Sequence, residues 1–314
     1  MKRNYPRDPQ VVPRFAGVTT FFRLPPVEDW RTLDVALTGL PFDSGASYRP
    51  GARYGPRAIR DASSLLRPYN PVLDVDPYKV LNFGDAGDLS LSPMDLNRTF
   101  AIVEERFRQV YQAGVTPVSF GGDHSLTLPV LRGVSERYPR VSLLQMDAHL
   151  DTWDSYFGSK FTHGSFMIRA VEEGVIDPER SLQVGIRGPL FGPEDLQRNR
   201  DWGLDIIHAE EAHSSAPSDV IKKIREKVGD RPLYVSFDVD ALDPAFTPGT
   251  GTPEVGGLTS AQAIEILRGL QGLNVVGADV VEVSPPYDQG QITAFLAARV
   301  GFELNCLIAL ARRG

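Results

Sequence analysis

The chain has 314 residues, 42% of them hydrophobic and 23% charged, a length and composition that allow a large core and exclude a disordered chain. Its formal net charge of −7 argues against nucleic-acid binding, because phosphate contacts need a clustered basic surface. Small-molecule chemistry is the better match to this charge.

The N-terminal residues and the single cysteine narrow the class of protein further. Met1 to Pro6 lack the apolar core of a signal peptide, and we identify no run long enough to span a bilayer, so we expect a cytoplasmic protein without a membrane partner. Cys306 is the only cysteine, which excludes an internal disulfide. It lies in an apolar helical pattern, which favours a buried small side chain over a nucleophile.

Residues 1–33 are rich in proline and arginine and have no clear period, which predicts an arm that lies over the surface or over a neighbouring subunit. We find no linker or compositional break after it, which predicts one catalytic domain over residues 34–314. Within that domain, apolar runs of strand length recur at residues 35–40, 80–83, 115–120, 141–146, 182–186, 204–207, 233–237 and 275–280.

Helical patterns lie between most of these runs, and several have recognisable starts. The stretch Ser92-Pro93-Met94-Asp95 offers a cap and a proline before a helix to about Ala113. Thr259 and Gln262 have the spacing of a capping box, and Pro56 opens a third helix. Strands separated by helices predict an α/β fold, a three-layer α/β/α sandwich around a mainly parallel sheet of about eight strands.

Acidic and imidazole side chains follow four of the predicted strands. His124 follows residues 115–120, Asp147 and His149 follow 141–146, Asp238 and Asp240 follow 233–237, and Glu282 follows 275–280. Alternation puts Asp147 and His149 on the same side, and Asp151 can join them if the chain bends there. An isolated Asp-x-His-x-Asp is usually a solvated loop. Ligands of parallel sheets bind at the carboxyl ends of the strands, so this convergence favours a functional site.

The first strand is not followed by a G-x-G-x-x-G motif, which disfavours a dinucleotide-binding site.

Four carboxylates in one pocket need compensating cations. Two like charges about 4 Å apart repel by roughly 4 kcal/mol at an effective dielectric of about 20. Two imidazoles and four carboxylates without a thiolate suit Mn²⁺ better than structural zinc, with Ni²⁺, Co²⁺ or Fe²⁺ as alternatives. Six ligands exceed the needs of one tetrahedral ion, so we expect two metals roughly 3.5 to 4 Å apart and a hydrolytic reaction.

Three ordered motifs resemble those of the ureohydrolase family, which includes arginase and agmatinase. They are GGDHS at residues 121–125, DAHLD at 147–151, and SFDVD at 236–240 followed by DPAFTPGTGTP at 243–253. The similarity runs from about Asp34 to the C-terminus. The resemblance implies two Mn²⁺ ions per subunit, one held by His124, Asp147, Asp151 and Asp238 and the other by His149, Asp147, Asp238 and Asp240, with Asp147 and Asp238 as bridges.

The same resemblance implies further site residues. His163, in a His-Gly pair beyond the second motif, resembles the family's proton shuttle, and we count Asp151 among the catalytic residues as well as the ligands. Glu282 resembles the acid that binds the guanidinium group, with a buried structural ion pair as the alternative. Asp123 is expected to bond backbone or to orient a ligand, and we assign no function to His208 or His213.

The substrate is the least determined feature. Residues 151–160 depart from the polar segment that arginases use for an α-amino acid, and similarity to the agmatinase branch ranks agmatine, cleaved to putrescine and urea, first. 4-Guanidinobutanoate comes next, followed by other guanidino acids and by an alkylated guanidine or a biguanide. Arg49, Lys160 or Arg187 would suit a carboxylate and Asp154 an ammonium, although each has a structural interpretation. The family implies a homo-oligomer, a trimer or hexamer.

Two other classes of protein have the same fold class or motifs. A zinc-dependent deacetylase would favour one metal and an adjacent His-His pair, which this sequence lacks. A catalytically silent metal-binding scaffold would be expected to have lost a ligand or His163, and all are present.

Overall fold

The computed structural model describes residues 3–312 and contains one eight-stranded sheet. Its order is β2-β1-β3-β8-β7-β4-β5-β6, and every pairing is parallel. The strands are β1 (Val35–Leu40), β2 (Phe83–Asp88), β3 (Thr116–Gly121), β4 (Ser142–Met146), β5 (Leu182–Ile186), β6 (Asp205–His208), β7 (Leu233–Asp238) and β8 (Val275–Val281). The predicted α/β architecture and strand number are confirmed.

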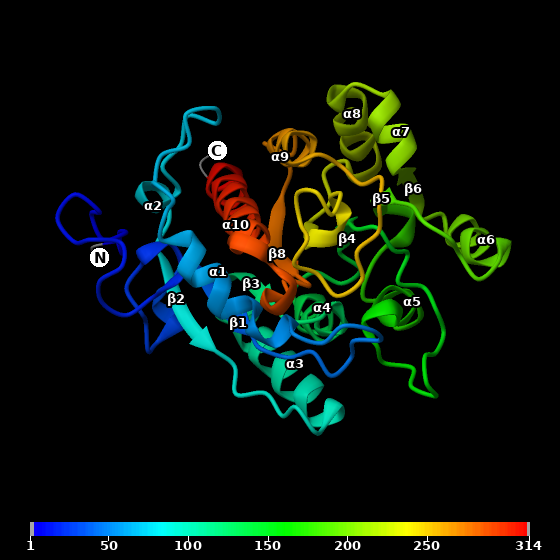
Figure 1. Cartoon of the computed structure of the whole chain (residues 1–314), viewed down its shortest axis with the longest axis horizontal. Coiled ribbons are helices and arrows are strands. Elements are labelled where there is room, and N and C mark those ends of the chain that lie inside the picture. The colour runs from blue at the N-terminus through cyan, green and yellow to red at the C-terminus, as the bar shows by residue number, and fades with distance from the viewer. Residues whose placement is uncertain (1–2, 313–314) are drawn as a thin grey trace.

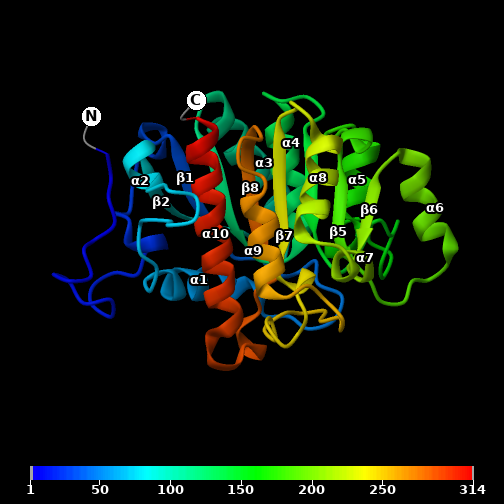
Figure 2. The same ribbon diagram turned by 90° about the horizontal axis from the view of Figure 1, so that it is seen from above.

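Helices cover both faces of the sheet (Figures 1 and 2). One face carries α1, α8, α9 and α10, and the other carries α3, α4 and α5. The helices are α1 (Gly55–Ser63), α2 (Pro77–Val80), α3 (Leu96–Gln112), α4 (Thr127–Ser135), α5 (Phe166–Glu172), α6 (Pro193–Trp202), α7 (Ala209–Ser214), α8 (Pro217–Val228), α9 (Ser260–Arg268) and α10 (Ile292–Ala311). Because both faces are covered, the central strands are buried throughout and read as continuous apolar runs.

The edge strand β2 differs most from its predicted position. Residues 77–80 form the short helix α2, which has Pro77 at its start, and the strand begins only at Phe83. It continues through Asp85 and Asp88, whose carboxylates pair with Arg60 of α1. Because two positions of this strand carry carboxylates in buried or half-buried ion pairs, it lacks the apolar pattern by which strands are recognised.

The helix starts behave as their capping residues predict, with one shift. The Thr259 side chain and Gln262 form a capping box at α9, and Pro56 lies in the first turn of α1. Helix α3 begins at Leu96 rather than at Pro93, because Asp95 is the residue whose carboxylate caps the backbone N–H of Arg98 at 2.9 Å.

The C-terminal helix is apolar on every side. Residues Gln289–Ala311 are long and apolar enough to cross a membrane by length and composition, so the expectation that no run reaches this length is wrong. However, 72% of the most apolar stretch is buried inside the fold, where α10 packs against α1, α9 and β8. Burial of this kind accounts for an all-round apolar helix in the core of a large domain.

Part of the predicted N-terminal arm packs into the core. Phe21, Phe22 and Leu24 are buried, and the Phe21 ring stacks on Phe120 of β3 with 4.3 Å between centroids. Farther towards the N-terminus, Phe15 is 93% exposed. The division into an arm over residues 1–33 and a catalytic domain over 34–314 stays a prediction.

Candidate metal centre

The strand order explains why ligand-type side chains meet. The four central strands β3, β8, β7 and β4 are consecutive neighbours. At their carboxyl ends they carry His124, Glu282, Asp238 and Asp147, respectively. Residues far apart in the chain therefore share one edge of the sheet.

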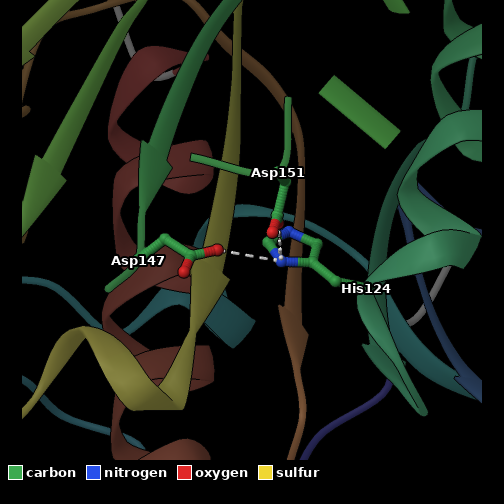
Figure 3. Close-up of side chains that lie close together, drawn as sticks. All are labelled: His124, Asp147 and Asp151. Atoms are coloured by element: carbon green, nitrogen blue, oxygen red, sulfur yellow. Dashed lines mark ion pairs between the residues drawn. The ribbon is translucent and has the colours of Figure 1, made fainter. Parts of the chain in front are cut away.

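A first cluster surrounds the imidazole of His124. Its Nδ1 lies 3.0 Å from Asp147 Oδ2, 3.2 Å from Asp151 Oδ2 and 3.2 Å from Asp238 Oδ2. Figure 3 shows the carboxylates of Asp147 and Asp151 directed at this ring. Asp151 has a φ of 53°, so the chain does bend there and its carboxylate turns back into the cluster.

A second cluster shares Asp147 with the first. His149 Nδ1 lies 3.5 Å from Asp147 Oδ1 and 3.1 Å from Asp240 Oδ2. The two oxygens of Asp147 thus face two different imidazoles. Asp238 faces the first cluster through Oδ2, and its Oδ1 accepts a hydrogen bond from the backbone N–H of Asp240 at 2.9 Å. Its predicted bridging role stays a prediction.

The hydrogen bonds around His124 determine which of its nitrogens is free. Ser236 donates its single hydroxyl hydrogen to Asp279 Oδ1 at 2.6 Å, so it accepts from His124 Nε2–H at 2.8 Å. Nδ1 of the neutral ring then presents a lone pair to three carboxylate oxygens, and this buried atom has no hydrogen-bond partner. Such an arrangement is repulsive unless a cation lies between them. The donor set therefore fits a divalent metal.

The pKa values of the cluster show the same deficit of positive charge. Burial and the neighbouring Asp147 raise the pKa of Asp151 to about 7. Burial, Asp240 and Asp147 hold the pKa of Asp238 well above its ordinary value. The His124 pKa is raised too, because the surrounding carboxylates outweigh a burial penalty that acts in the opposite direction. Without metal, these side chains retain protons where cations would otherwise balance the charge.

His163 and Glu282 form a second polar group beside the clusters. His163 Nδ1 lies 3.0 Å from Glu282 Oε1, and its Nε2 lies 2.7 Å from Ser47 Oγ. Glu282 Oε1 also accepts from the backbone N–H of His124 at 3.0 Å, which couples this pair to the first cluster. Although burial alone opposes the charged form, Glu282 raises the pKa of His163 to about 9.

A small cavity brings most of these groups to one surface. Its volume is about 120 Å³. Its lining residues are Ser47, His124, His149, Asp151, Trp153, Tyr156, His163, Gly164, Asp238, Thr252 and Glu282. The cavity therefore opens onto both imidazoles of the clusters and onto the His163–Glu282 pair.

The sequence model of the arginase family matches residues 33–306, which is most of the chain. The chain belongs to the arginase family. A guanidinopropionase from Pseudomonas aeruginosa is 48% identical over 97% of this chain and 96% of its own, and a mitochondrial agmatinase from Gallus gallus is 41% identical over 97% and 90%. The solved structure of proclavaminate amidino hydrolase from Streptomyces clavuligerus superposes with a TM-score of 0.92 at 41% identity, covering 96% of this chain and 100% of that one. The resemblance to ureohydrolases is confirmed.

This arginase-family site also contains residues that the sequence reasoning missed. Gln145 Nε2 donates to Asp147 Oδ2 at 2.7 Å and to Asp151 Oδ2 at 3.1 Å. Gln183 Nε2 donates to Gln145 Oε1 at 2.6 Å, and Asn199 Nδ2 donates to Gln183 Oε1 at 2.6 Å. We call Gln145, Gln183 and Asn199 the amide relay. All three are fully buried. The signal for Gln145 and Gln183 was a polar side chain inside an apolar strand pattern, whereas Asn199 lies in the polar helix α6.

The remaining predicted residues lie outside the clusters. Asp123 accepts from the backbone N–H groups of Gly45 and Ser125 at 2.7 and 3.0 Å, as alternation predicts. His208 and His213 lie near backbone carbonyls, 3.3 and 3.1 Å away, respectively.

Charged residues considered for the substrate tail have other partners. Arg187 donates to six backbone carbonyls, of Gly185, Asp240, Ala241, Leu242, Glu254 and Val255. Asp154 pairs with Arg169. The Arg49 guanidinium lies over the rings of both Tyr48 and Tyr287. These contacts favour a structural role for Arg187, Asp154 and Arg49.

Proposed function

We propose that this chain hydrolyses a guanidino compound to urea and an amine at a pair of divalent cations. The observation that carries the proposal is Asp147, whose two carboxylate oxygens face the imidazoles of two separate clusters. Two adjacent cation sites with a shared carboxylate are the arrangement that binuclear hydrolysis needs. In the overall reaction, water supplies an oxygen to the guanidinium carbon, the bond from that carbon to the substituted nitrogen breaks, and the leaving amine takes a proton.

The cations would be held by both clusters. One site would use His124, Asp147, Asp151 and Asp238, and the other His149, Asp147, Asp238 and Asp240. Hard oxygen donors with imidazole favour Mn²⁺, and Ni²⁺ or Co²⁺ would suit the same ligands. When bound, such a pair supplies a nucleophilic hydroxide at neutral pH and Lewis acidity at the carbon under attack.

Glu282 and His163 would act on the substrate itself. The Glu282 carboxylate lines the cavity and would hold the planar guanidinium group through charge-assisted hydrogen bonds. His163, whose pKa of about 9 keeps it protonated at neutral pH, would give its proton to the departing amine.

The names of the relatives support two kinds of guanidino substrate. Guanidinopropionase and guanidinobutyrase of Pseudomonas aeruginosa, at 48% and 43% identity, are named for guanidino acids, and the agmatinase of Gallus gallus is named for agmatine. Agmatine and 4-guanidinobutanoate, the two compounds that the sequence ranks first, remain candidates beside 3-guanidinopropanoate.

A urea-release screen tests the proposal. The full chain, loaded with Mn²⁺ or with Ni²⁺, is given agmatine, 4-guanidinobutanoate, 3-guanidinopropanoate, arginine, and free and alkylated guanidines. We expect metal-dependent urea from at least one of them. A protein that binds two metal ions per subunit and releases urea from none would instead be the metal-binding scaffold.

A further inference from the structure

One wall of the cavity is formed by an anchored tryptophan. The Trp153 indole N–H donates to Asp195 Oδ2 at 3.3 Å, and the Trp153 backbone N–H donates to the carbonyl of Gly164 at 3.1 Å. Asp195 is buried and also accepts from the backbone N–H of Phe191 at 3.1 Å. The indole is therefore held at its ring nitrogen and at its backbone.

Other aromatic rings extend this wall. Trp153 meets Tyr156 and Phe191 edge to face, with centroids 5.8 and 5.6 Å apart, and Tyr156 and Phe191 are 6.0 Å apart. Phe157 lies beside Tyr156 and is 85% exposed, and Phe191 is 74% exposed. Large apolar side chains at this exposure, next to a cavity, provide an apolar surface for a ligand.

Gly164 makes room for the indole. A Cβ at this position would lie 2.8 Å from Cε3 of Trp153, closer than carbon atoms approach one another. Gly164 directly follows His163, so the glycine lets the indole lie against the backbone next to the proposed proton donor. Trp153 and Tyr156 thus belong to the same connection, between β4 and α5, as Asp151 and His163.

Apart from His163, which pairs with Glu282, and the histidines of the two clusters, residues 3–312 offer the cavity no positively charged side chain for an anionic tail. The acidic and imidazole side chains of the lining are four cluster residues (His124, His149, Asp151 and Asp238), His163 and Glu282, and the others are Ser47, Trp153, Tyr156, Gly164 and Thr252. Within the described part of the chain, no lysine or arginine belongs to this lining. A carboxylate that left water here would lose its hydration without gaining a lysine or arginine partner, and it would compete with Glu282 for His163.

The cavity is also small, with a volume of about 120 Å³ that the guanidinium group would share with the two proposed cations. A chain of three or four methylenes with a charged end would have to pass the aromatic wall to reach solvent.

From this wall, lining and size we propose that the preferred substrate is a guanidine with a short, uncharged alkyl substituent that packs on Trp153 and Tyr156. The inference rests on the proposed function and narrows its substrate class. The products would be urea and a small alkylamine.

The specificity of the unmodified enzyme provides the first test. The metal-loaded protein is assayed for kcat/KM with methylguanidine, 1,1-dimethylguanidine, propylguanidine, 3-guanidinopropanoate and agmatine. We expect kcat/KM for an alkylguanidine to exceed that for both charged compounds by about tenfold or more, because a charged end loses hydration at the aromatic wall and an alkyl end does not. A higher kcat/KM for 3-guanidinopropanoate or for agmatine overturns the inference and leaves the proposed function intact. If neither these five compounds nor any other guanidino compound releases urea, both the inference and the proposed function are wrong.

Substitution of Trp153 provides the second test. Trp153→Asn should raise KM for the alkylguanidines by about tenfold while the metal content stays unchanged and the protein stays folded, and Trp153→Phe should restore most of the loss. Substrate binding should also quench the fluorescence of the unmodified protein, which has three tryptophans, and Trp153→Asn should abolish that change. Trp202→Phe, on α6, is the matched control. Unchanged KM values and unchanged quenching in a folded Trp153→Asn protein would contradict the role of the wall.

Discussion

At the scale of single residues, Asp147 is the side chain on which both proposed cations depend. Its oxygens lie 3.0 Å from His124 Nδ1 and 3.5 Å from His149 Nδ1. We therefore predict that Asp147→Ala loses both ions and all turnover, whereas loss of a ligand to one site alone would leave the other ion bound. Metal content after dialysis, measured by elemental analysis beside urea release, checks this. Full activity in a metal-stripped Asp147→Ala protein would refute the assignment.

Substitution of Glu282 should affect substrate binding and not metal binding, because this residue lies beside the clusters and touches His163. Glu282→Gln should raise KM by about 10- to 100-fold, the loss expected for one hydrogen bond to a charged group, while two ions per subunit stay bound. Steady-state kinetics and metal content are measured on the same preparation. If metal were lost instead, Glu282 would be a ligand and not the substrate carboxylate.

The His163–Glu282 pair also predicts a pH dependence of stability. Because the folded-state pKa of His163 is raised to about 9, its contribution to the free energy of unfolding is present in full below about pH 6.5 and is lost as the pH rises through 9. For the metal-free protein, the stability lost over this interval should be on the order of 3 kcal/mol greater than in His163→Asn. Urea denaturation at several pH values measures the difference. Parallel curves for the two proteins would show that the pair is not charged.

At the scale of elements, the amide relay connects β4, β5 and α6 to the proposed metal ligands Asp147 and Asp151. Gln145→Leu keeps the size of the side chain but removes the N–H groups that hold Asp147 and Asp151, so metal affinity should fall by about 10- to 100-fold. Titration with Mn²⁺ followed by calorimetry gives this value. Gln197→Leu, an exposed amide on α6 that pairs with Asp201, is the matched control and should bind metal normally. Equal affinities would mean that the relay only fills the core.

The elements differ in how much of them could be predicted from sequence. The central strands were recognisable because they are buried on both faces and therefore continuously apolar. The edge strand β2 was misplaced because it uses Asp85 and Asp88 to pair with Arg60, a residue of α1 that no local pattern connects to it. Gln145 and Gln183 were passed over for a similar reason, since their hydrogen-bond partners come from other elements.

At the scale of the whole molecule, we predict a homo-oligomer, a trimer or a hexamer. The N-terminal segment runs along the outside of the domain (Figure 2). The exposed fractions of Val11, Phe15 and Val18 in this segment are 77%, 93% and 74%, respectively. Apolar side chains at this exposure are more stable when covered by a neighbouring subunit. Light scattering should give a mass of about three or six times 34.6 kDa, and a monomer would contradict the prediction. A cytoplasmic location also stays a prediction.

The sequence by itself determined the α/β class and which acidic and imidazole side chains follow the central strands. Each such residue is recognised from its place just after its own strand, and parallel strands end at a common edge of the sheet. Only the tertiary structure decided that β3, β8, β7 and β4 are neighbours, that an amide relay supports Asp147 and Asp151, and that Trp153 walls the cavity. Strand order and side-chain packing depend on contacts between segments that are distant in the chain. Short sequence patterns do not contain those contacts.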